Sequence, residues 1–323
     1  MADDADLELG FPIMRYDVTM PLLEGRVAIP GVKLRPMPTM SMVFGDLPAL
    51  RSGEFGLWDL NLGYLLPAIE AGWELVALPV FCKRKPAYQF IFCREGIETP
   101  RDLEGKRIGS GSYRTALTVF ARGFLQHRHG VDVNSMRWLV WRDEHLPLHE
   151  THTAISRVLD PRKSVVDALL DGDVDALITD ISDVDLFKQL EESPKVHRLF
   201  GDYVAEDERL FRETGMCTPV HLVVMSAKLD REHPDLARRL YDAFEEAKRL
   251  AEWDVLSDRG GLTMPYLRER VLEARARWGD VFQHGLAANR ATMETFMGYN
   301  LEQGTIAEGL PLERVFAQST LDT

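Results

Sequence analysis

The 323-residue chain has few of the features that mark a secreted or membrane protein. Its three cysteines are odd in number and form no Cys-x-x-Cys pair, so reduced thiols are the simplest expectation. No apolar run approaches the roughly 20 residues of a transmembrane helix. The N-terminal stretch MADDADLELGFPIM lacks the basic and apolar segments of a signal peptide. Together these absences predict a cytoplasmic protein.

Positive charge is scarce relative to negative charge. The chain has 38 Lys and Arg against 51 Asp and Glu, a formal net charge of −13. Such a balance disfavours general affinity for nucleic acid or for an anionic membrane, and we expect neither as a partner. It leaves room for a small anionic substrate held by a local cluster of arginines. Hydrophobic residues make up 45%, enough for a substantial core.

Complete nucleotide and hydrolase motifs are also absent. The stretch IGSGSYRTAL has Gly109 and Gly111, but Arg114 stands where a dinucleotide fingerprint needs its third glycine. The chain has no P-loop and no Gly-x-Ser-x-Gly elbow. The stretch still leads into a helix, whose first N–H groups can hold a carboxylate or phosphate. The alternative is a capped helix with a flexible entry turn. Three hydroxyl side chains would assist the anion: Ser110, Ser112 and Thr115.

Histidines gather in the segment HLPLHETH, but we predict no metal site there. His145 and His149 have a spacing that binds zinc on a regular helix, and Glu150 and His152 follow. Pro147 disfavours a regular helix, and no His-Glu-x-x-His motif is present. The segment is more typical of an exposed loop.

Two other short segments carry candidate chemistry. The segment FCKRKPAY places Lys83 and Arg84 after a strand, where they form either a carboxylate clamp or a solvated basic turn. His221 begins an apolar strand after Thr218 and Pro219. A histidine in this position is either a hydrogen-bonded structural residue or a functional one.

Strand-like runs alternate with helical patterns along most of the chain, which predicts an α/β fold with mostly parallel sheets. Ligands in such folds lie beyond the carboxyl ends of strands. The loops that follow the predicted strands are therefore the candidate binding loops: 14–17, 59–64, 81–88, 109–115, 179–183 and 217–221.

In chain order, several segments resemble the 4,5-dihydroxyphthalate decarboxylase family, which is similar in turn to type II periplasmic binding proteins. The segments are RYDVTMPLLEGRVAIPGVKL, LRSGEFGLWDLNLGYLL, ALPVFCKRKPAYQFIFCREGIETPRDLEGKRIGSGSYRTALTVFARGFLQHRHGVDVNSMRW, LLDGDVDALIT and FRETGMCTPVHLVVMSAKL. The resemblance implies a two-lobed type II periplasmic-binding-protein-like α/β fold with a ligand cleft between the lobes. It implies one lobe of residues 1–98 plus 222–323 and an inserted lobe of residues 99–221.

The family's motifs match this sequence residue by residue only in part. Tyr16 and Asp17 match an N-terminal loop, Asp59 keeps a carboxylate where the family has Glu, and Arg84 matches a Pro-Val-Phe-x-x-Arg segment. Further matches are Tyr113, Thr115, Arg122, Gly123 and the segment Pro219-Val220-His221. Val18 and the segment Pro86-Ala87-Tyr88 depart from the pattern, so the exact substrate stays open.

The resemblance implies a cofactor-independent decarboxylase of a hydroxylated aromatic carboxylic acid similar to 4,5-dihydroxyphthalate. A proton would be donated to the ring carbon in the cleft. The expected catalytic residues are His221, Asp59 and Arg84. The expected substrate-binding residues are Arg15, Tyr16, Asn61, Lys83, Ser110, Ser112, Tyr113, Arg114, Thr115 and Asp180. The expected partner is a small aromatic carboxylate, with a homo-oligomer left open. The alternative is a non-catalytic solute-binding or ligand-sensing protein with the same fold.

Overall fold

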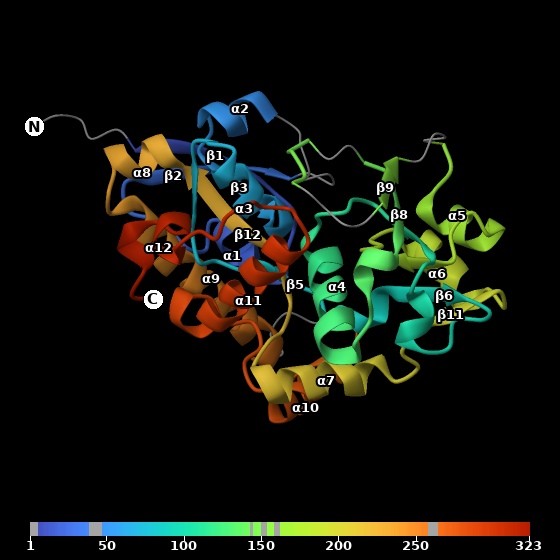
Figure 1. Cartoon of the computed structure of the whole chain (residues 1–323). Coiled ribbons are helices and arrows are strands. Elements are labelled where there is room, and N and C mark those ends of the chain that lie inside the picture. Colours follow the sequence, from blue (N-terminus) through green and yellow to red (C-terminus); the bar gives the residue numbers. More distant parts are fainter. Residues whose placement is uncertain (1–5, 39–46, 143–144, 150–153, 158–161, 258–263) are drawn as a thin grey trace, which may run out of the picture. The chain divides into compact units, whose positions relative to one another are not determined.

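The computed structural model describes residues 6–38, 47–142, 145–149, 154–157, 162–257 and 264–323. The chain forms two compact units (Figure 1). The first unit is residues 1–84, 219–294 and 310–323, and the second unit is residues 85–218 and 295–309. These ranges differ from the predicted lobes, since the chain enters the second unit at Lys85 and returns to it at Thr295. The earlier entry follows from strand β6 (Ile91–Arg94), which pairs with two strands of the second unit.

The first unit contains two sheets. Strands β1 (Leu7–Ile13) and β2 (Val32–Pro38) pair in parallel. In the other sheet, β12 (Pro219–Ser226) lies between β3 (Leu57–Asn61) and β4 (Leu75–Ala77), and β5 (Lys83–Arg84) also pairs with it. All three of these pairings are antiparallel, so the expectation of mostly parallel sheets is wrong for this second sheet. The reason is that the chain re-enters the unit through β12, which runs opposite to its neighbours.

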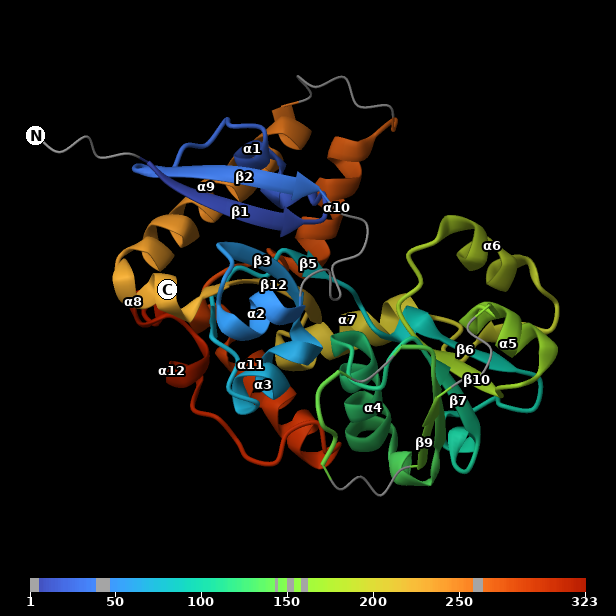
Figure 2. The ribbon, with the colours of Figure 1, turned by 90° about the horizontal axis from the view of Figure 1, so that it is seen from above.

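A long helix covers the β1–β2 pair of the first unit. Helix α9 (Leu236–Ser257) places Leu240 and Phe244 in a core shared with Phe11 of β1. The rings of Phe11 and Phe244 meet edge to face at 5.9 Å. Figure 2 shows α9 beside β1 and β2. The other helices that lie in or begin in this unit are α1 (Met20–Leu23), α2 (Leu47–Ser52), α3 (Leu62–Glu70), α8 (Ala227–Glu232), α10 (Leu267–Trp278), α11 (Leu286–Glu302) and α12 (Leu312–Val315).

The second unit is built on one six-stranded sheet with the order β11-β6-β10-β7-β8-β9. Strands β10, β7, β8 and β9 run parallel, whereas β6 is antiparallel to both of its neighbours. The bounds are β7 (Arg107–Ser110), β8 (Arg137–Val140), β9 (Ala154–Arg157), β10 (Ala176–Ile178) and β11 (Val196–Arg198). The predicted α/β character is therefore confirmed here, with a mixed sheet.

Helices cover both faces of this sheet. Helix α4 (Ala116–His129) lies on one face, and α5 (Val165–Asp171) and α6 (Val184–Glu192) lie on the other (Figure 2). Helix α7 (Tyr203–Thr214) completes the unit. The predicted helix after the IGSGS stretch is confirmed, and it ends at Gly130 with φ +66°, a conformation that glycine adopts readily. Among the described residues, no helix is long and apolar enough to cross a membrane.

Candidate active site

A buried histidine and a buried carboxylate meet where β3 and β12 pair in the first unit. His221 stands directly opposite Asn61 in the antiparallel register, and Val223 stands opposite Asp59. Asp59 is therefore a diagonal neighbour of His221 on the same face of the sheet. The Nδ1 atom of His221 lies 2.8 Å from Oδ1 of Asp59. The sequence predicted both residues as catalytic, and the structure brings them into hydrogen-bonding contact.

Four donors surround the Asp59 carboxylate, which is fully buried. Oδ1 accepts from Nδ1 of His221 and from the thiol of Cys82, whose Sγ lies 3.7 Å away. Oδ2 accepts from the Tyr16 hydroxyl at 2.7 Å and from the Met14 backbone N–H at 3.3 Å. A carboxylate offers about four lone-pair positions, and these donors match that number. All four of these contacts are with groups of the protein, and a catalytic role for Asp59 stays a prediction.

Asn61 determines which nitrogen of neutral His221 carries the proton. Its Oδ1 accepts the Gly63 backbone N–H at 3.0 Å, which caps helix α3 and leaves the Nδ2 amide group to face His221. That Nδ2 atom lies 3.4 Å from Nε2 of His221. Since Nδ2 only donates, Nε2 is the acceptor and Nδ1 carries the hydrogen that binds Asp59. Once Nε2 is protonated it no longer accepts from Asn61 and can donate to an electron-rich group instead.

Lys83 lies on β5, which pairs with β12 on the side opposite to β3. Its backbone pairs with His221, so that Asn61, His221 and Lys83 occupy neighbouring strands. The register of this pairing is irregular between Pro219 and His221. Arg15 is exposed and precedes Tyr16 in the chain. Two cationic side chains therefore belong to segments that supply this site.

The predicted catalytic residue Arg84 has partners inside the first unit. Its guanidinium is buried and donates to the Gln283 backbone carbonyl and to Oδ1 of Asn289, both at 2.7 Å. It also lies over the Phe81 ring, 5.3 Å from the centroid. These contacts are those of a residue that joins β5 to the start of α11 and to the segment before it. A catalytic role for Arg84 stays a prediction.

His284 is a buried histidine that the sequence did not single out. Its Nδ1 accepts the Phe81 backbone N–H at 3.2 Å. Burial lowers the pKa of His284 to about 3, and the nearby charges of Lys248 and Arg84 act in the same direction. The imidazole is therefore neutral at ordinary pH and serves as a structural acceptor.

The hydroxyl side chains that follow β7 in the second unit bind one another. Ser110 donates to the Ser112 carbonyl at 2.9 Å, and its Oγ lies 3.1 Å from the Thr118 hydroxyl. The Thr115 hydroxyl also contacts Thr118, at 2.7 Å. The structure gathers these predicted residues around the start of α4. Their use as carboxylate ligands stays a prediction.

Arg114 and Tyr113 are buried in the second unit. Arg114 is 0% exposed and donates to the backbone carbonyls of Leu146 and Pro147, at 2.6 and 3.2 Å. The Tyr113 hydroxyl donates to the Gln303 carbonyl at 3.4 Å. Both side chains hold later segments of the chain against the start of α4. Contact of either one with a substrate stays a prediction.

Asp180 forms an ion pair with Lys85 in the second unit. The Ser182 hydroxyl also donates to Asp180, at 3.4 Å, and the Lys85 ammonium lies 4.9 Å from the centroid of the Phe90 ring. The ion pair compensates the charge that Asp180 would bring to a ligand. The predicted role of Asp180 in substrate binding is not tested by these contacts.

The histidine segment can be followed only in part. His145 and His149 belong to the described residues, whereas Glu150 and His152 lie outside them. Within the described ranges, no group of three or more His, Cys, Asp or Glu side chains could hold a metal ion.

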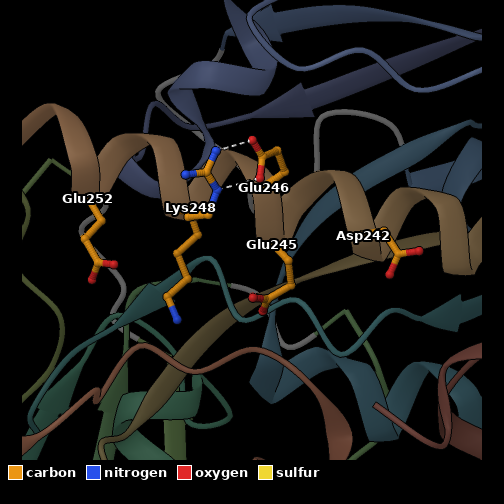
Figure 3. A pocket seen from close by; sticks show the side chains of 6 residues that line it. Asp242, Glu245, Glu246, Lys248 and Glu252 are labelled. Carbon is orange, nitrogen blue, oxygen red and sulfur yellow. Dashed lines mark hydrogen bonds and ion pairs between the residues drawn. The ribbon is translucent and has the colours of Figure 1, made fainter.

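A surface hollow of about 370 Å³ runs along α9. Figure 3 shows its charged side chains, with Glu246 ion-paired to Arg249, and Lys248 also donates to Asp280. Burial raises the pKa of the Glu245 carboxyl. Four carboxylates and two cations line the hollow, and this excess of negative charge disfavours an anionic ligand. The carboxylates are those of Asp242, Glu245, Glu246 and Glu252.

Comparison with known proteins supports the resemblance seen in the sequence. No family model matches the chain. The chain is 26% identical over 331 residues to a 4,5-dihydroxyphthalate decarboxylase of Comamonas testosteroni, with 98% of each chain covered. It is 31% identical over 137 residues to a protein of the same name from Pseudomonas putida, covering 41% of this chain and 52% of that one.

Solved structures confirm the predicted binding-protein-like fold. The periplasmic aliphatic sulphonate binding protein SsuA of Escherichia coli superposes with a TM-score of 0.56 and 15% identity, covering 97% of this chain and 92% of that one. The desulfurization enzyme DSZB superposes with a TM-score of 0.53 and 17% identity, covering 98% of each chain. Because the fold is shared by a binding protein and an enzyme, it does not decide between these classes.

Proposed function

We propose that the chain is a cofactor-independent decarboxylase of a hydroxylated aromatic carboxylic acid, such as 4,5-dihydroxyphthalate. The observation that carries the proposal is the His221–Asp59 pair, with its 2.8 Å Nδ1–Oδ1 contact. Sequence similarity to proteins named 4,5-dihydroxyphthalate decarboxylase supports the substrate class.

His221 is the proton donor in this proposal. The protonated imidazole donates its Nε2 hydrogen to the ring carbon that bears the carboxylate, and a π-electron pair of the ring forms the new C–H bond. A hydroxyl group ortho or para to that carbon stabilises the resulting cation. The C–C bond to the carboxylate then breaks, its electron pair restores the aromatic ring, and CO₂ leaves. His221 recovers a proton from solvent.

Asp59 has a different part from the one that the sequence suggested. As a buried acceptor of four hydrogen bonds, it orients His221 and stabilises the imidazolium, in the way that the third member of a catalytic triad orients its histidine. The donation from Asn61 to neutral Nε2 is lost on protonation. A ligand that presents an electron-rich ring carbon at this position replaces that interaction.

Lys83 and Arg15 are the cations we assign to the substrate carboxylate. Lys83 is half-buried and paired with His221 across the sheet, and Arg15 is exposed on the segment that also carries Tyr16. A cation beside the carboxylate keeps it ionised, which decarboxylation requires. We expect Lys83→Met and Arg15→Met each to raise KM more than they lower kcat.

The test is incubation with 4,5-dihydroxyphthalate and with a panel of hydroxybenzoates, followed by quantification of CO₂ and of the decarboxylated arene. Equal amounts of CO₂ and product support the proposal. The absence of turnover with every compound, together with a ligand-induced rise in Tm, would instead support a binding protein.

The alternative is a non-catalytic binding protein, because the chain shares its fold with sulphonate-binding proteins as well as with an enzyme. Cell fractionation separates the two, since the decarboxylase proposal includes a cytoplasmic location and a transport-linked binding protein must reach the outside of the membrane.

A further inference from the structure

A cysteine that the proposed mechanism does not use lies beside its orienting carboxylate. Cys82 belongs to the segment between β4 and β5, and its side chain is buried in the core that also contains Tyr16. Its Sγ lies 3.7 Å from Oδ1 of Asp59, the oxygen that also accepts from His221. The distance is that of a hydrogen bond to sulfur.

The thiol keeps its proton in this environment. Burial raises the pKa of Cys82 well above its ordinary value, and the charge of Asp59 raises it further. A protonated thiol is a weak donor and a poor nucleophile. The geometry therefore makes Cys82 a hydrogen-bond donor to Asp59 rather than an attacking group.

We infer that Cys82 is a positioning residue: its S–H···Oδ1 bond holds the Asp59 carboxylate in the rotamer that aims His221. Without it, the His221 contact is the one that Oδ1 keeps among the described residues, while Oδ2 stays bound to Tyr16 and Met14. The carboxylate group can then rotate about its Cβ–Cγ bond while Oδ2 keeps its two donors. The His221 imidazole, which is hydrogen-bonded to Oδ1, then changes its orientation as well. The effect on rate rests on the proposed function, whereas the hydrogen bond itself does not.

Three substitutions separate the hydrogen bond from the volume of the side chain. Cys82→Ala removes the donor, and Cys82→Ser restores a donor of similar shape. Cys93→Ala is the matched control, because Cys93 on β6 is 0% exposed and its removal tests the cost of losing any buried thiol.

The ligand-free experiment is infrared spectroscopy of the S–H stretch. The difference spectrum between wild type and Cys82→Ala isolates the Cys82 band, and that between wild type and Cys93→Ala isolates the control band. We expect the Cys82 band at lower frequency than the Cys93 band, and a shift of the Cys82 band in Asp59→Asn. Bands at the same frequency would overturn the inference whether or not the protein is an enzyme.

The activity experiment then measures kcat, KM and the pH–rate profile with the substrate that the CO₂ assay identifies. We expect Cys82→Ala to lower kcat about 5- to 30-fold, with KM within about twofold, as for the loss of a hydrogen bond to a charged group. Cys82→Ser is expected to recover most of that loss, and the pH–rate midpoint is expected to move in Cys82→Ala but not in Cys93→Ala. A Cys82→Ala enzyme with unchanged kcat and pH–rate profile would contradict the positioning role even if the infrared bands differ.

Discussion

The Nδ1 atom of His221 and the Oδ1 atom of Asp59 lie 2.8 Å apart, although the two residues are 162 positions apart in the chain. The contact exists because β12 returns to the first unit and pairs with β3 in a register that makes the two residues diagonal neighbours. It places Nδ1 against the carboxylate and leaves Nε2 beside the Asn61 amide, and our proposal gives Nε2 the task of proton donation to the ligand.

Replacing Asp59 with asparagine tests this division of tasks. The amide can offer a hydrogen to Nδ1, which favours the opposite tautomer, and it removes the charge that stabilises the imidazolium. We expect kcat of Asp59→Asn to fall by roughly 100-fold or more. Asp185→Asn, on the exposed surface of α6, is the control and should keep the wild-type rate. An Asp59→Asn enzyme with wild-type kcat would refute the orienting role.

Tyr16→Phe tests whether this side chain serves the carboxylate or the substrate. The sequence suggested contact with the substrate, whereas the structure shows the hydroxyl 2.7 Å from Oδ2 of Asp59. Loss of that donor is expected to lower kcat about 5- to 50-fold and to leave KM nearly unchanged. The opposite pattern, a raised KM with normal kcat, would indicate that Tyr16 contacts the substrate instead. Tyr266→Phe is the control, since Tyr266 is largely exposed.

The sequence predicted the α/β fold, helix α4 and both members of the His221–Asp59 pair, because hydrophobic periodicity, a terminal glycine and the order of family motifs are local signals. It did not predict that Asp59 lies in hydrogen-bonding contact with His221, because strand register is a long-range property. Cys82 was missed because a buried cysteine in an apolar run is indistinguishable from a core residue until its neighbours are known.

Some residues that match the family's motifs have packing partners in the structure. The Arg122 guanidinium lies 3.6 Å from the centroid of the Tyr113 ring and donates to Gln303. A Cβ atom on Gly123 would lie 2.3 Å from the Tyr299 ring. A motif match marks a constrained position, and only the structure shows whether the constraint is packing or chemistry.

Gly123→Ala tests this packing constraint within α4. Because the added methyl group meets the Tyr299 ring, we expect the free energy of unfolding to fall by about 1–3 kcal/mol. Gly298→Ala is the matched control on α11, where a Cβ atom meets nothing within 4 Å, and it should be neutral or stabilising by up to about 1 kcal/mol. Chemical denaturation measures both. Equal stability of Gly123→Ala and wild type would argue against the close approach.

The buried carboxyl group of Asp207 is expected to make the free energy of unfolding depend on pH. Burial on α7 raises the pKa of its carboxyl from 3.8 to about 7, against the opposing effect of the Tyr88 and Ala87 backbone N–H groups. The folded state therefore favours the protonated form, and this stabilisation is present below pH 3.8 and is lost as pH rises through about 7.

Asp207→Asn should remove that loss. Above about pH 7, we expect the free energy of unfolding of the variant to exceed that of wild type by about 1–4 kcal/mol. The difference should vanish toward pH 4, and chemical denaturation measures it. Glu192→Gln, on the exposed face of α6, should show no such pH-dependent difference. A constant offset between Asp207→Asn and wild type at every pH would contradict the assignment.

The most direct test of the account is the rate of CO₂ release by His221→Ala at saturating 4,5-dihydroxyphthalate, with ligand affinity measured by calorimetry. We expect a loss of kcat of roughly 100-fold or more, with Kd changed only a few-fold, because the proton donor is removed and the carboxylate contacts remain. His127→Ala, whose side chain is 42% exposed on α4, should turn over at the wild-type rate. CO₂ release by His221→Ala at the wild-type rate would contradict the central claim.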